Sequence, residues 1–206
     1  MRFSPRNVVI AMRTDTPQAI YLKDYTPPAY WIDTVDLDVA IHAGYAVVSA
    51  TLAMCCNTGG PLLLNGEEVE LESIAVDGRP LAASEYAIAG EQLTVLAELP
   101  EQFTLSTVSR IQPDNNTQLS GLYRSKDGYF TQCEAQGFRR ITWFLDRPDV
   151  MAVYTLTIHA DKAQFPVLLG NGNPVAAGDE ADGRHWAKWH DPFKKPCYLF
   201  AMVAAK

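Results

Sequence analysis

The sequence contains no long apolar segment and no large cluster of basic residues. No stretch approaches the ~20 consecutive apolar residues that a membrane-spanning helix needs, and the apolar residues 8–11 are too few for the core of a signal peptide. The formal net charge is −7, from 24 acidic and 17 basic side chains, whereas nucleic-acid binding depends on clustered Lys and Arg. We therefore expect a cytoplasmic protein that binds neither a membrane nor a nucleic acid.

Only two short basic pairs occur, Arg139-Arg140 and Lys194-Lys195. Each pair is too small to attract a polyanion. Long cationic side chains usually keep their charged ends in water, so we interpret both pairs as solvated surface residues.

Cysteine is also scarce. The four residues Cys55, Cys56, Cys133 and Cys197 have the spacing of neither a metal site nor a disulfide framework. Because a chain without an export signal remains in a reducing compartment, we expect four free thiols.

The motifs of a self-contained enzyme do not occur. The sequence contains no H-E-x-x-H zinc motif, no G-x-x-x-x-G-K-[ST] phosphate loop and no G-x-S-x-G nucleophile motif. His185 and His190 share one face of neither a helix nor a strand, and we interpret them as packing residues. His159 lies at the end of a predicted strand, with no acidic partner nearby in the sequence that would orient its ring. The residues by themselves predict no catalytic group and no metal ligand in this chain.

Hydrophobic periodicity predicts an all-β, mainly antiparallel fold. Odd positions are apolar in residues 35–41 and even positions in residues 46–54, which predicts two half-buried strands joined as an antiparallel hairpin. Asn65-Gly66 is typical of a type I′ turn and predicts a hairpin between residues 62–64 and 69–76. Further short strands follow, and one helical segment is predicted near residues 136–143. This pattern favours a β-sandwich with at most one or two short helices.

One polar segment is unusual for the end of a strand. Residues 131–139 read T-Q-C-E-A-Q-G-F-R, so Glu134 has no basic neighbour before Arg139. A carboxylate that loses water without a partner costs free energy, and it is then useful mainly for binding a cation. The residues alone favour a solvated loop glutamate over a cation-binding one.

Six segments in the second half of the chain are G-L-Y, T-Q-C-E-A-Q-G-F-R, L-D-R-P-D-V, F-P-V-L-L-G-N-G-N, G-R-H-W, and D-P-F followed by K-P-C-Y-L-F, at residues 121–123, 131–139, 145–150, 165–173, 183–186, and 191–193 with 195–200. In content and order they resemble the N-terminal domain of bacterial aminopeptidase N. Each segment alone is a weak signal, but six in register are specific, and the similarity extends from about residue 20 to the end. Gly170 and Pro174 stand where that group more often has Ser and Arg. The sequence therefore resembles this zinc metallo-aminopeptidase family.

The resemblance implies a saddle-like β domain that caps a catalytic domain with an H-E-x-x-H zinc site. In this family a loop of the cap enters the active site. There Glu134 would bind the α-amino group of a peptide substrate and Gln132 would line the same pocket. The resemblance also implies a cis peptide bond between Glu134 and Ala135.

The predicted organisation is a flexible extension over residues 1–12 and one β domain over residues 13–206, with the catalytic domain absent from this sequence. Because the chain ends directly after a strand, we expect the sequence to be cut before that domain, so it would hydrolyse nothing alone. It would contain no catalytic residue and no cofactor of its own, whereas the full-length enzyme would use zinc. The expected partners are a peptide N-terminus and the protein's own catalytic domain.

Two other functions stay open. The chain could be a stand-alone β-sandwich that binds carbohydrate or protein, with Trp186, Trp189 and Tyr198 as a sugar platform. It could also be a natural inactive homologue that ends at residue 206.

Overall fold

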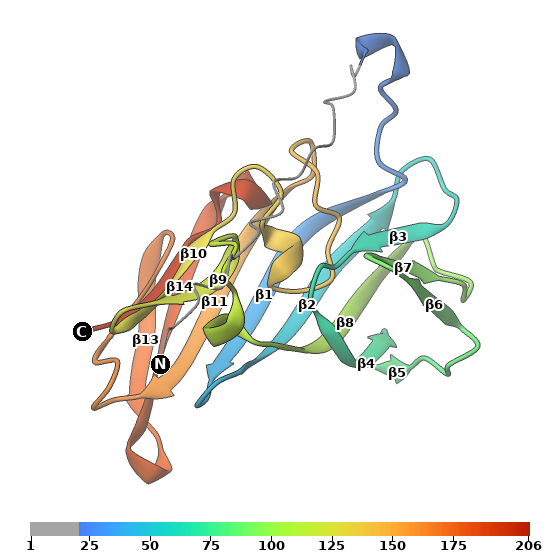
Figure 1. The fold of residues 1–206 in the computed structure, drawn as a ribbon. Coiled ribbons are helices and arrows are strands. Elements are labelled where there is room, and N and C mark those ends of the chain that lie inside the picture. The colour runs from blue at the N-terminus through green and yellow to red at the C-terminus, as the bar shows by residue number, and fades with distance from the viewer. Residues whose placement is uncertain (1–20) are drawn as a thin grey trace, which may run out of the picture.

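The computed structural model describes residues 21–206, and the regular structure of that part is almost entirely β-strand. The flexible extension predicted for residues 1–12 lies outside the described residues. The strands form three sheets of eight, four and three strands. Figure 1 shows the two smaller sheets in front of the large one.

The eight-stranded sheet has the strand order β13-β14-β11-β1-β2-β8-β4-β5. Its central strands β1 and β11 run parallel, and all its other neighbouring strands pair antiparallel. The strands are β1 (Tyr30–Ile41), β2 (Ala46–Cys56), β4 (Glu70–Val76), β5 (Arg79–Pro80), β8 (Gln102–Ile111), β11 (Met151–Asp161), β13 (Asn173–Asp179) and β14 (Arg184–Pro196).

One face of this sheet is buried across its central strands β11, β1, β2 and β8. Val35 of β1 is in register with Leu52 of β2, which in turn faces Leu105 of β8, and Leu37 of β1 faces Leu156 of β11. All five side chains are at most 3% exposed. Burying each one contributes ~1.5–3 kcal/mol, so the alternating apolar pattern supplies a large share of the driving force for folding. The predicted β1–β2 hairpin is confirmed.

The two smaller sheets form the second layer of the sandwich. Their strand orders are β12-β15-β10-β9 and β3-β7-β6, and residues of all three sheets belong to one apolar core. The all-β, mainly antiparallel prediction is therefore confirmed. The strands are β3 (Leu62–Asn65), β6 (Tyr86–Ala89), β7 (Gln92–Val95), β9 (Gly121–Ser125), β10 (Gly128–Gln132), β12 (Val167–Gly170) and β15 (Met202–Ala205).

The hairpin predicted at Asn65-Gly66 is wrong. Strand β3 pairs with β7 rather than with β4, and the backbone of Asn65 exchanges hydrogen bonds of 2.8 and 3.0 Å with Phe144. Gly66 is needed for space, because a Cβ there would lie 2.6 Å from ring atoms of Trp143. Tertiary packing therefore overrides the local turn signal. A turn with two positive φ angles (50° and 77°) occurs instead at Asp77-Gly78, between β4 and β5.

Helical structure is limited to single 3₁₀ turns. The described part of the chain has five of them and no α-helix, in agreement with the expected maximum of one or two short helices. The helical segment predicted near residues 136–143 is a single turn of three residues, and the bridge between Phe144 and Asn65 follows it. The turns are η1 (Leu22–Asp24), η2 (Pro113–Asn115), η3 (Phe138–Arg140), η4 (Ala181–Gly183) and η5 (Cys197–Leu199).

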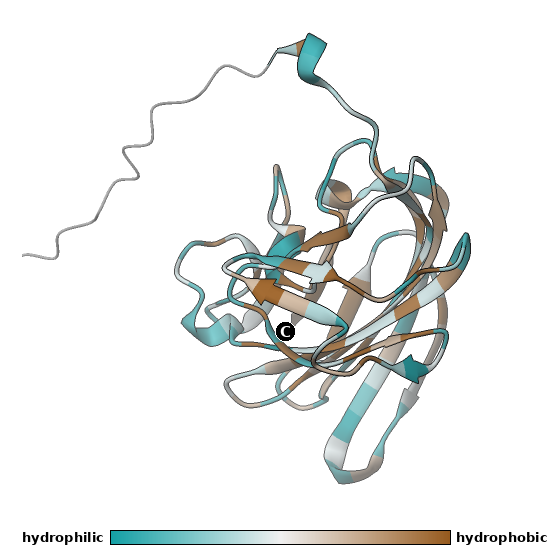
Figure 2. Cartoon of the chain, turned by 90° about the vertical axis from the view of Figure 1, so that its right-hand side faces the viewer, coloured by the Kyte–Doolittle hydropathy of each residue, from teal (hydrophilic) through white to brown (hydrophobic). Residues whose placement is uncertain are grey.

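Strand β13 was not predicted from the sequence. It forms the edge of the large sheet, and six of its seven residues are exposed, so it lacks the alternation that marks a half-buried strand. Together with β14 it forms a long hairpin that projects from the body of the fold (Figure 1). Figure 2 shows largely hydrophilic residues toward the end of this hairpin.

Candidate functional site

The segment that carries Glu134 leaves the end of β10 and folds back on itself before η3. The N–H of Gly137 donates a 2.8 Å hydrogen bond to the carbonyl of Cys133. Gly137 has no room for a side chain, since a Cβ would lie 2.9 Å from both the Cα of Cys133 and the Oγ of Ser120. The Glu134–Ala135 peptide bond is cis, as expected. We call residues 133–137 the Glu134 loop.

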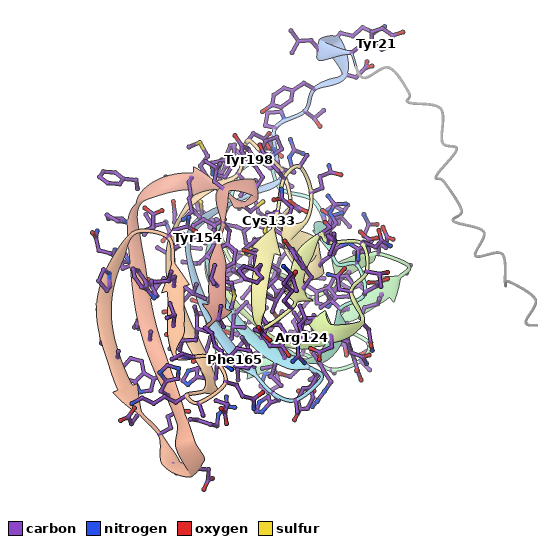
Figure 3. The ribbon with its side chains drawn as sticks, turned by 60° about the vertical axis from the view of Figure 1, so that its left-hand side comes forward. Tyr21, Arg124, Cys133, Tyr154, Phe165 and Tyr198 are labelled. Atoms are coloured by element: carbon purple, nitrogen blue, oxygen red, sulfur yellow. The ribbon has the colours of Figure 1, made fainter. Side chains whose placement is uncertain are left out.

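The Glu134 loop lies at one end of the sandwich. Figure 3 shows Cys133 and Tyr198 at the end nearest to the segment that carries Tyr21, and Arg124 and Phe165 at the opposite end. The turn of the β9–β10 hairpin is therefore remote from the Glu134 loop, although both belong to the same pair of strands.

Glu134 and Gln132 both point to the surface. Both residues are exposed, and the Gln132 side-chain amide donates to the backbone carbonyl of Glu134 at 3.5 Å. Within residues 21–206 the Glu134 carboxylate has neither an ion-pair nor a hydrogen-bond partner. The structure therefore brings the two predicted site residues together, and within residues 21–206 the Glu134 carboxylate is unpaired.

A cluster of aromatic side chains in the core anchors the end of the Glu134 loop. Phe138, which begins η3, is fully buried. Its ring packs edge-to-face on Phe144 and Phe200, with centroid distances of 4.6 and 5.2 Å, and on Tyr154 at 6.1 Å. Edge-to-face pairs are favoured by the charge distribution of the rings, so the cluster fixes where the Glu134 loop ends.

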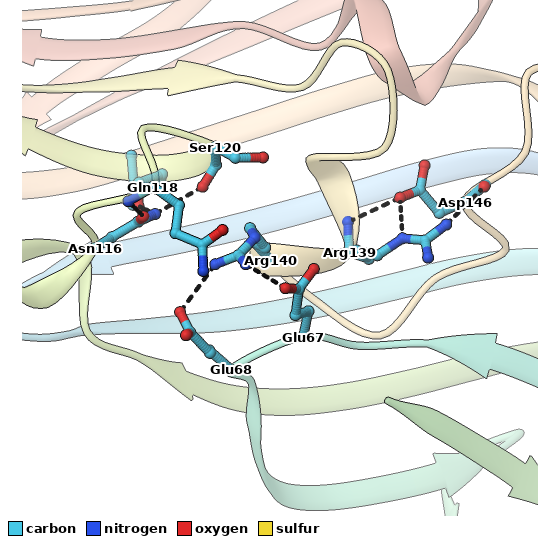
Figure 4. Close-up of polar contacts among 9 residues, drawn as sticks. Glu67, Glu68, Asn116, Gln118, Ser120, Arg139, Arg140 and Asp146 are labelled. Atoms are coloured by element: carbon cyan, nitrogen blue, oxygen red, sulfur yellow. Dashed lines mark hydrogen bonds and ion pairs between the residues drawn. The ribbon is translucent and has the colours of Figure 1, made fainter. Parts of the chain in front are cut away.

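The two arginines after the loop point in opposite directions (Figure 4). Arg139 donates from Nε to Asp146 at 2.7 Å and from its backbone N–H to the same carboxylate oxygen at 3.3 Å. Arg140 donates to Glu68 at 2.9 Å and to Glu67. Arg140 is 6% exposed, so the interpretation of this pair as solvated surface is wrong. No local pattern marks this pairing, since the acidic partners of Arg140 lie on a loop that is distant in the chain.

The second basic pair is also only partly a surface feature. Lys195 is buried, and its Nζ lies 3.0 Å from Asp191 and 4.0 Å from the centre of the Tyr154 ring. Burial lowers the pKa of Lys195 from its ordinary value, and the nearby Asp191 carboxylate opposes that shift. Lys194 is exposed and pairs with Asp33 at 2.6 Å.

Two cysteines lie beside the Glu134 loop as buried, protonated thiols. Burial and the nearby Asp146 carboxylate raise the pKa of Cys133 to about 12, and the same two causes raise the pKa of Cys197 further. The thiol of Cys197 donates to the second carboxylate oxygen of Asp146 at 3.1 Å. All four cysteines are free thiols, as expected. A thiol that stays protonated is a poor nucleophile, so Cys133 and Cys197 have a packing role.

His159 has two acidic partners that are distant in the sequence. Its two ring nitrogens lie 3.0 Å from Asp38 and 2.6 Å from Glu180. The hydrogen bond to Asp38, followed by that to Glu180, raises the pKa of His159, against an opposing effect of burial. His185 and His190 each make one side-chain hydrogen bond. His185 bonds to the backbone carbonyl of Phe165 and His190 to the hydroxyl of Thr155, which fits packing residues.

Two of the three aromatic residues of the alternative sugar platform make contacts within the fold. The indole N–H of Trp189 donates to the carbonyl of Leu168 at 3.1 Å. Trp186 lies against Gly178, where a Cβ would approach the indole nitrogen to 2.9 Å. Neither residue is fully exposed, so the carbohydrate-binding alternative gains no support from their positions.

No complete active site forms among the described residues. A groove of about 630 Å³ opens beside Glu67 and Arg140, but neither Glu134 nor Gln132 lines it. In residues 21–206 no three His, Cys, Asp or Glu side chains gather closely enough to hold a metal ion. In the same part of the chain no helix is long and apolar enough to cross a membrane.

Comparison with known proteins identifies the family. Residues 32–199 match the Peptidase M1 N-terminal domain. The chain is 54% identical over 196 residues to Aminopeptidase N of Caulobacter vibrioides, and 48% identical over 193 residues to Aminopeptidase N of Escherichia coli. These alignments cover 94% and 93% of this chain but only 22% of each relative.

Solved structures agree with the sequence comparison. The crystal structure of Legionella pneumophila aminopeptidase A in complex with aspartic acid superposes with a TM-score of 0.85 and 31% identity, over 90% of this chain and 22% of that one. An M1 zinc metallopeptidase from Deinococcus radiodurans shares the fold, with a TM-score of 0.74 at 12% identity, over 86% of this chain and 42% of that one. The chain therefore belongs to the M1 family of metallopeptidases and corresponds to their N-terminal domain.

Proposed function

We propose that this chain is the substrate-amine recognition cap of a zinc-dependent aminopeptidase. In this proposal the Glu134 carboxylate binds the protonated α-amino group of a peptide, and Gln132 lines the same pocket. Zinc and the groups that cleave the peptide bond belong to the catalytic domain. The observation that carries the proposal is an exposed carboxylate without a partner in residues 21–206, on a loop whose two ends are fixed.

The chemistry of this arrangement fits an exopeptidase. A carboxylate opposite an ammonium group forms a charge-assisted hydrogen bond, which is stronger than a neutral one. Fixing the first residue of a peptide by its amine places only the first peptide bond at the metal, so specificity for the chain end follows from positioning. When bound in the catalytic domain, zinc would polarise the scissile carbonyl and activate water.

A chimera tests the role of Glu134. The 206-residue chain is joined to the remaining sequence of the Caulobacter relative, and hydrolysis of an aminoacyl chromogenic amide is measured. Glu134→Gln removes a hydrogen bond to a charged group worth about 1.5–3 kcal/mol, so kcat/KM should fall roughly 10- to 150-fold. Asp127→Asn, on the remote β9–β10 turn, is the matched control and should leave kcat/KM unchanged. Equal activity of Glu134→Gln and the control would refute the proposal.

The isolated chain tests whether peptide hydrolysis and zinc binding require the catalytic domain. We expect it to hydrolyse no aminoacyl substrate and to bind no stoichiometric zinc in equilibrium dialysis. Hydrolysis that persists through repurification and chelation would contradict this. Cytoplasmic localisation stays a prediction from the sequence, and fractionation of cells that express the full-length protein would test it.

A further inference from the structure

We propose that Asp146 is a positioning residue for the amine site, because it holds Arg139 away from Glu134. This inference rests on the proposed function. It explains why a loop with two arginines directly behind it still presents an unpaired carboxylate.

Arg139 is the cation that could compete with a substrate amine. It is the first basic residue after Glu134 in the chain, and the hydrogen bond between Gly137 and Cys133 folds the loop back, so that η3 begins beside the end of β10. Arg140 is not a competitor, because it is buried and pairs with Glu67 and Glu68 on the opposite side.

Asp146 binds Arg139 through both its carboxylate and its backbone carbonyl. One carboxylate oxygen accepts from Arg139 Nε at 2.7 Å and from the Arg139 backbone N–H at 3.3 Å. The backbone carbonyl of Asp146 accepts from Nη2 at 3.4 Å. The other carboxylate oxygen accepts from the Cys197 thiol at 3.1 Å. Two nitrogens of the guanidinium, Nε and Nη2, therefore donate to acceptors of a single residue, which directs the Arg139 side chain toward Asp146.

Burial makes this pairing the preferred one. The Asp146 side chain is 1% exposed and that of Arg139 is 16% exposed, whereas Glu134 is exposed. Removing one partner of a buried ion pair leaves an uncompensated charge and is strongly destabilising, while an exposed ion pair contributes little. Arg139 therefore stays with Asp146, and the Glu134 carboxylate stays available for an ammonium group.

The decisive experiment is a double-mutant cycle in the chimera. Asp146→Asn releases Arg139, which then pairs with Glu134, so KM for the aminoacyl substrate should rise about three- to fivefold, the upper part of the range of an exposed ion pair. Adding Arg139→Gln removes the competing cation and should return KM to within twofold of the parent. A purely structural role of Asp146 predicts no such rescue. If KM is raised equally in the single and the double variant, the proposal is overturned.

A second pair of variants keeps the proposal testable if Asp146→Asn does not fold. Gln136→Lys places a cation beside Glu134 at an exposed position and leaves Asp146 intact, so it should also raise KM about three- to fivefold. Ser125→Lys adds the same charge at the other, exposed end of the β9–β10 hairpin and should leave KM unchanged. An unchanged KM in Gln136→Lys would overturn the proposal.

The outcome separates this inference from the proposed function. If Glu134→Gln leaves kcat/KM unchanged, the amine role of Glu134 fails. If Glu134→Gln lowers kcat/KM but releasing Arg139 has no effect on KM, only the positioning role of Asp146 fails.

Discussion

Replacing Phe138 by Ala should lower the free energy of unfolding more than any surface substitution does. The reason is that the Phe138 ring joins the end of the Glu134 loop to the core. Truncating a fully buried Phe to Ala costs about 3–5 kcal/mol. Phe138→Leu refills much of the volume but loses the edge-to-face geometry with three rings. Each such pair contributes about 0.5–1.5 kcal/mol beyond burial. Since neighbouring contacts do not add fully, we expect Phe138→Leu to cost about 1–3 kcal/mol.

Urea and thermal unfolding of the 206-residue chain, followed by tryptophan fluorescence, measure these costs. A domain of this size loses about 2–4 °C of melting temperature per kcal/mol, so Phe138→Ala should melt roughly 6–20 °C below the parent. Phe193→Ala is the control: Phe193 is 78% exposed, and its removal should change stability by less than about 0.5 kcal/mol. If Phe138→Ala matches Phe193→Ala, or if Phe138→Leu is as damaging as Phe138→Ala, the account of the aromatic cluster is wrong.

Three further predictions concern packing, pH and thiol chemistry. Gly66→Ala pushes a methyl group into the Trp143 ring and should cost about 1–3 kcal/mol in urea unfolding, and an unchanged midpoint would contradict the packing argument. Because the Asp38 hydrogen bond raises the pKa of His159, its stabilisation is fully present below about pH 6.5 and is lost as the pH rises through the raised pKa. The melting-temperature advantage of the parent over His159→Gln should therefore shrink from about pH 6 to about pH 9, and a growing advantage would refute the assigned direction. Cys133, with its pKa raised to about 12, should react with a thiol reagent at about pH 8 only after unfolding, as mass spectrometry of the labelled peptide would show.

The strands that cross the centre of the sandwich were predictable because their burial alternates. Val35 and Leu37 follow a period of two, and so do the residues of β2 that face them, since one face of the sheet meets the core and the other meets water. The Glu134 loop is different. Its composition marked it as unusual, but its expected role came from the family resemblance, and residue physics alone favoured a solvated loop.

The features that local sequence patterns did not reveal share a physical cause. Each depends on partners that are distant in the chain. Asn65 carries a strong turn signal, yet its backbone is already paired with Phe144. The acidic partner Asp38 of His159 is 121 positions away, and the acidic partners of Arg140 are more than 70 positions away. Local sequence patterns predict secondary structure and solvent exposure. Buried ion pairs and backbone hydrogen bonds between distant segments depend instead on the tertiary structure.

The parallel pairing of β1 with β11 has a consequence for how this chain is made. Residues 34–40 pair with residues 153–159, so the strands β1, β2, β4, β5 and β8 emerge from the ribosome well before β11, which pairs with the other edge of β1. Until then one long edge of β1 offers unpaired N–H and C=O groups to any other extended chain. Contacts of such large sequence separation also form slowly. The nascent half-sheet is therefore the form most exposed to aggregation. Once β11 has been synthesised, it pairs with the free edge of β1 and covers it.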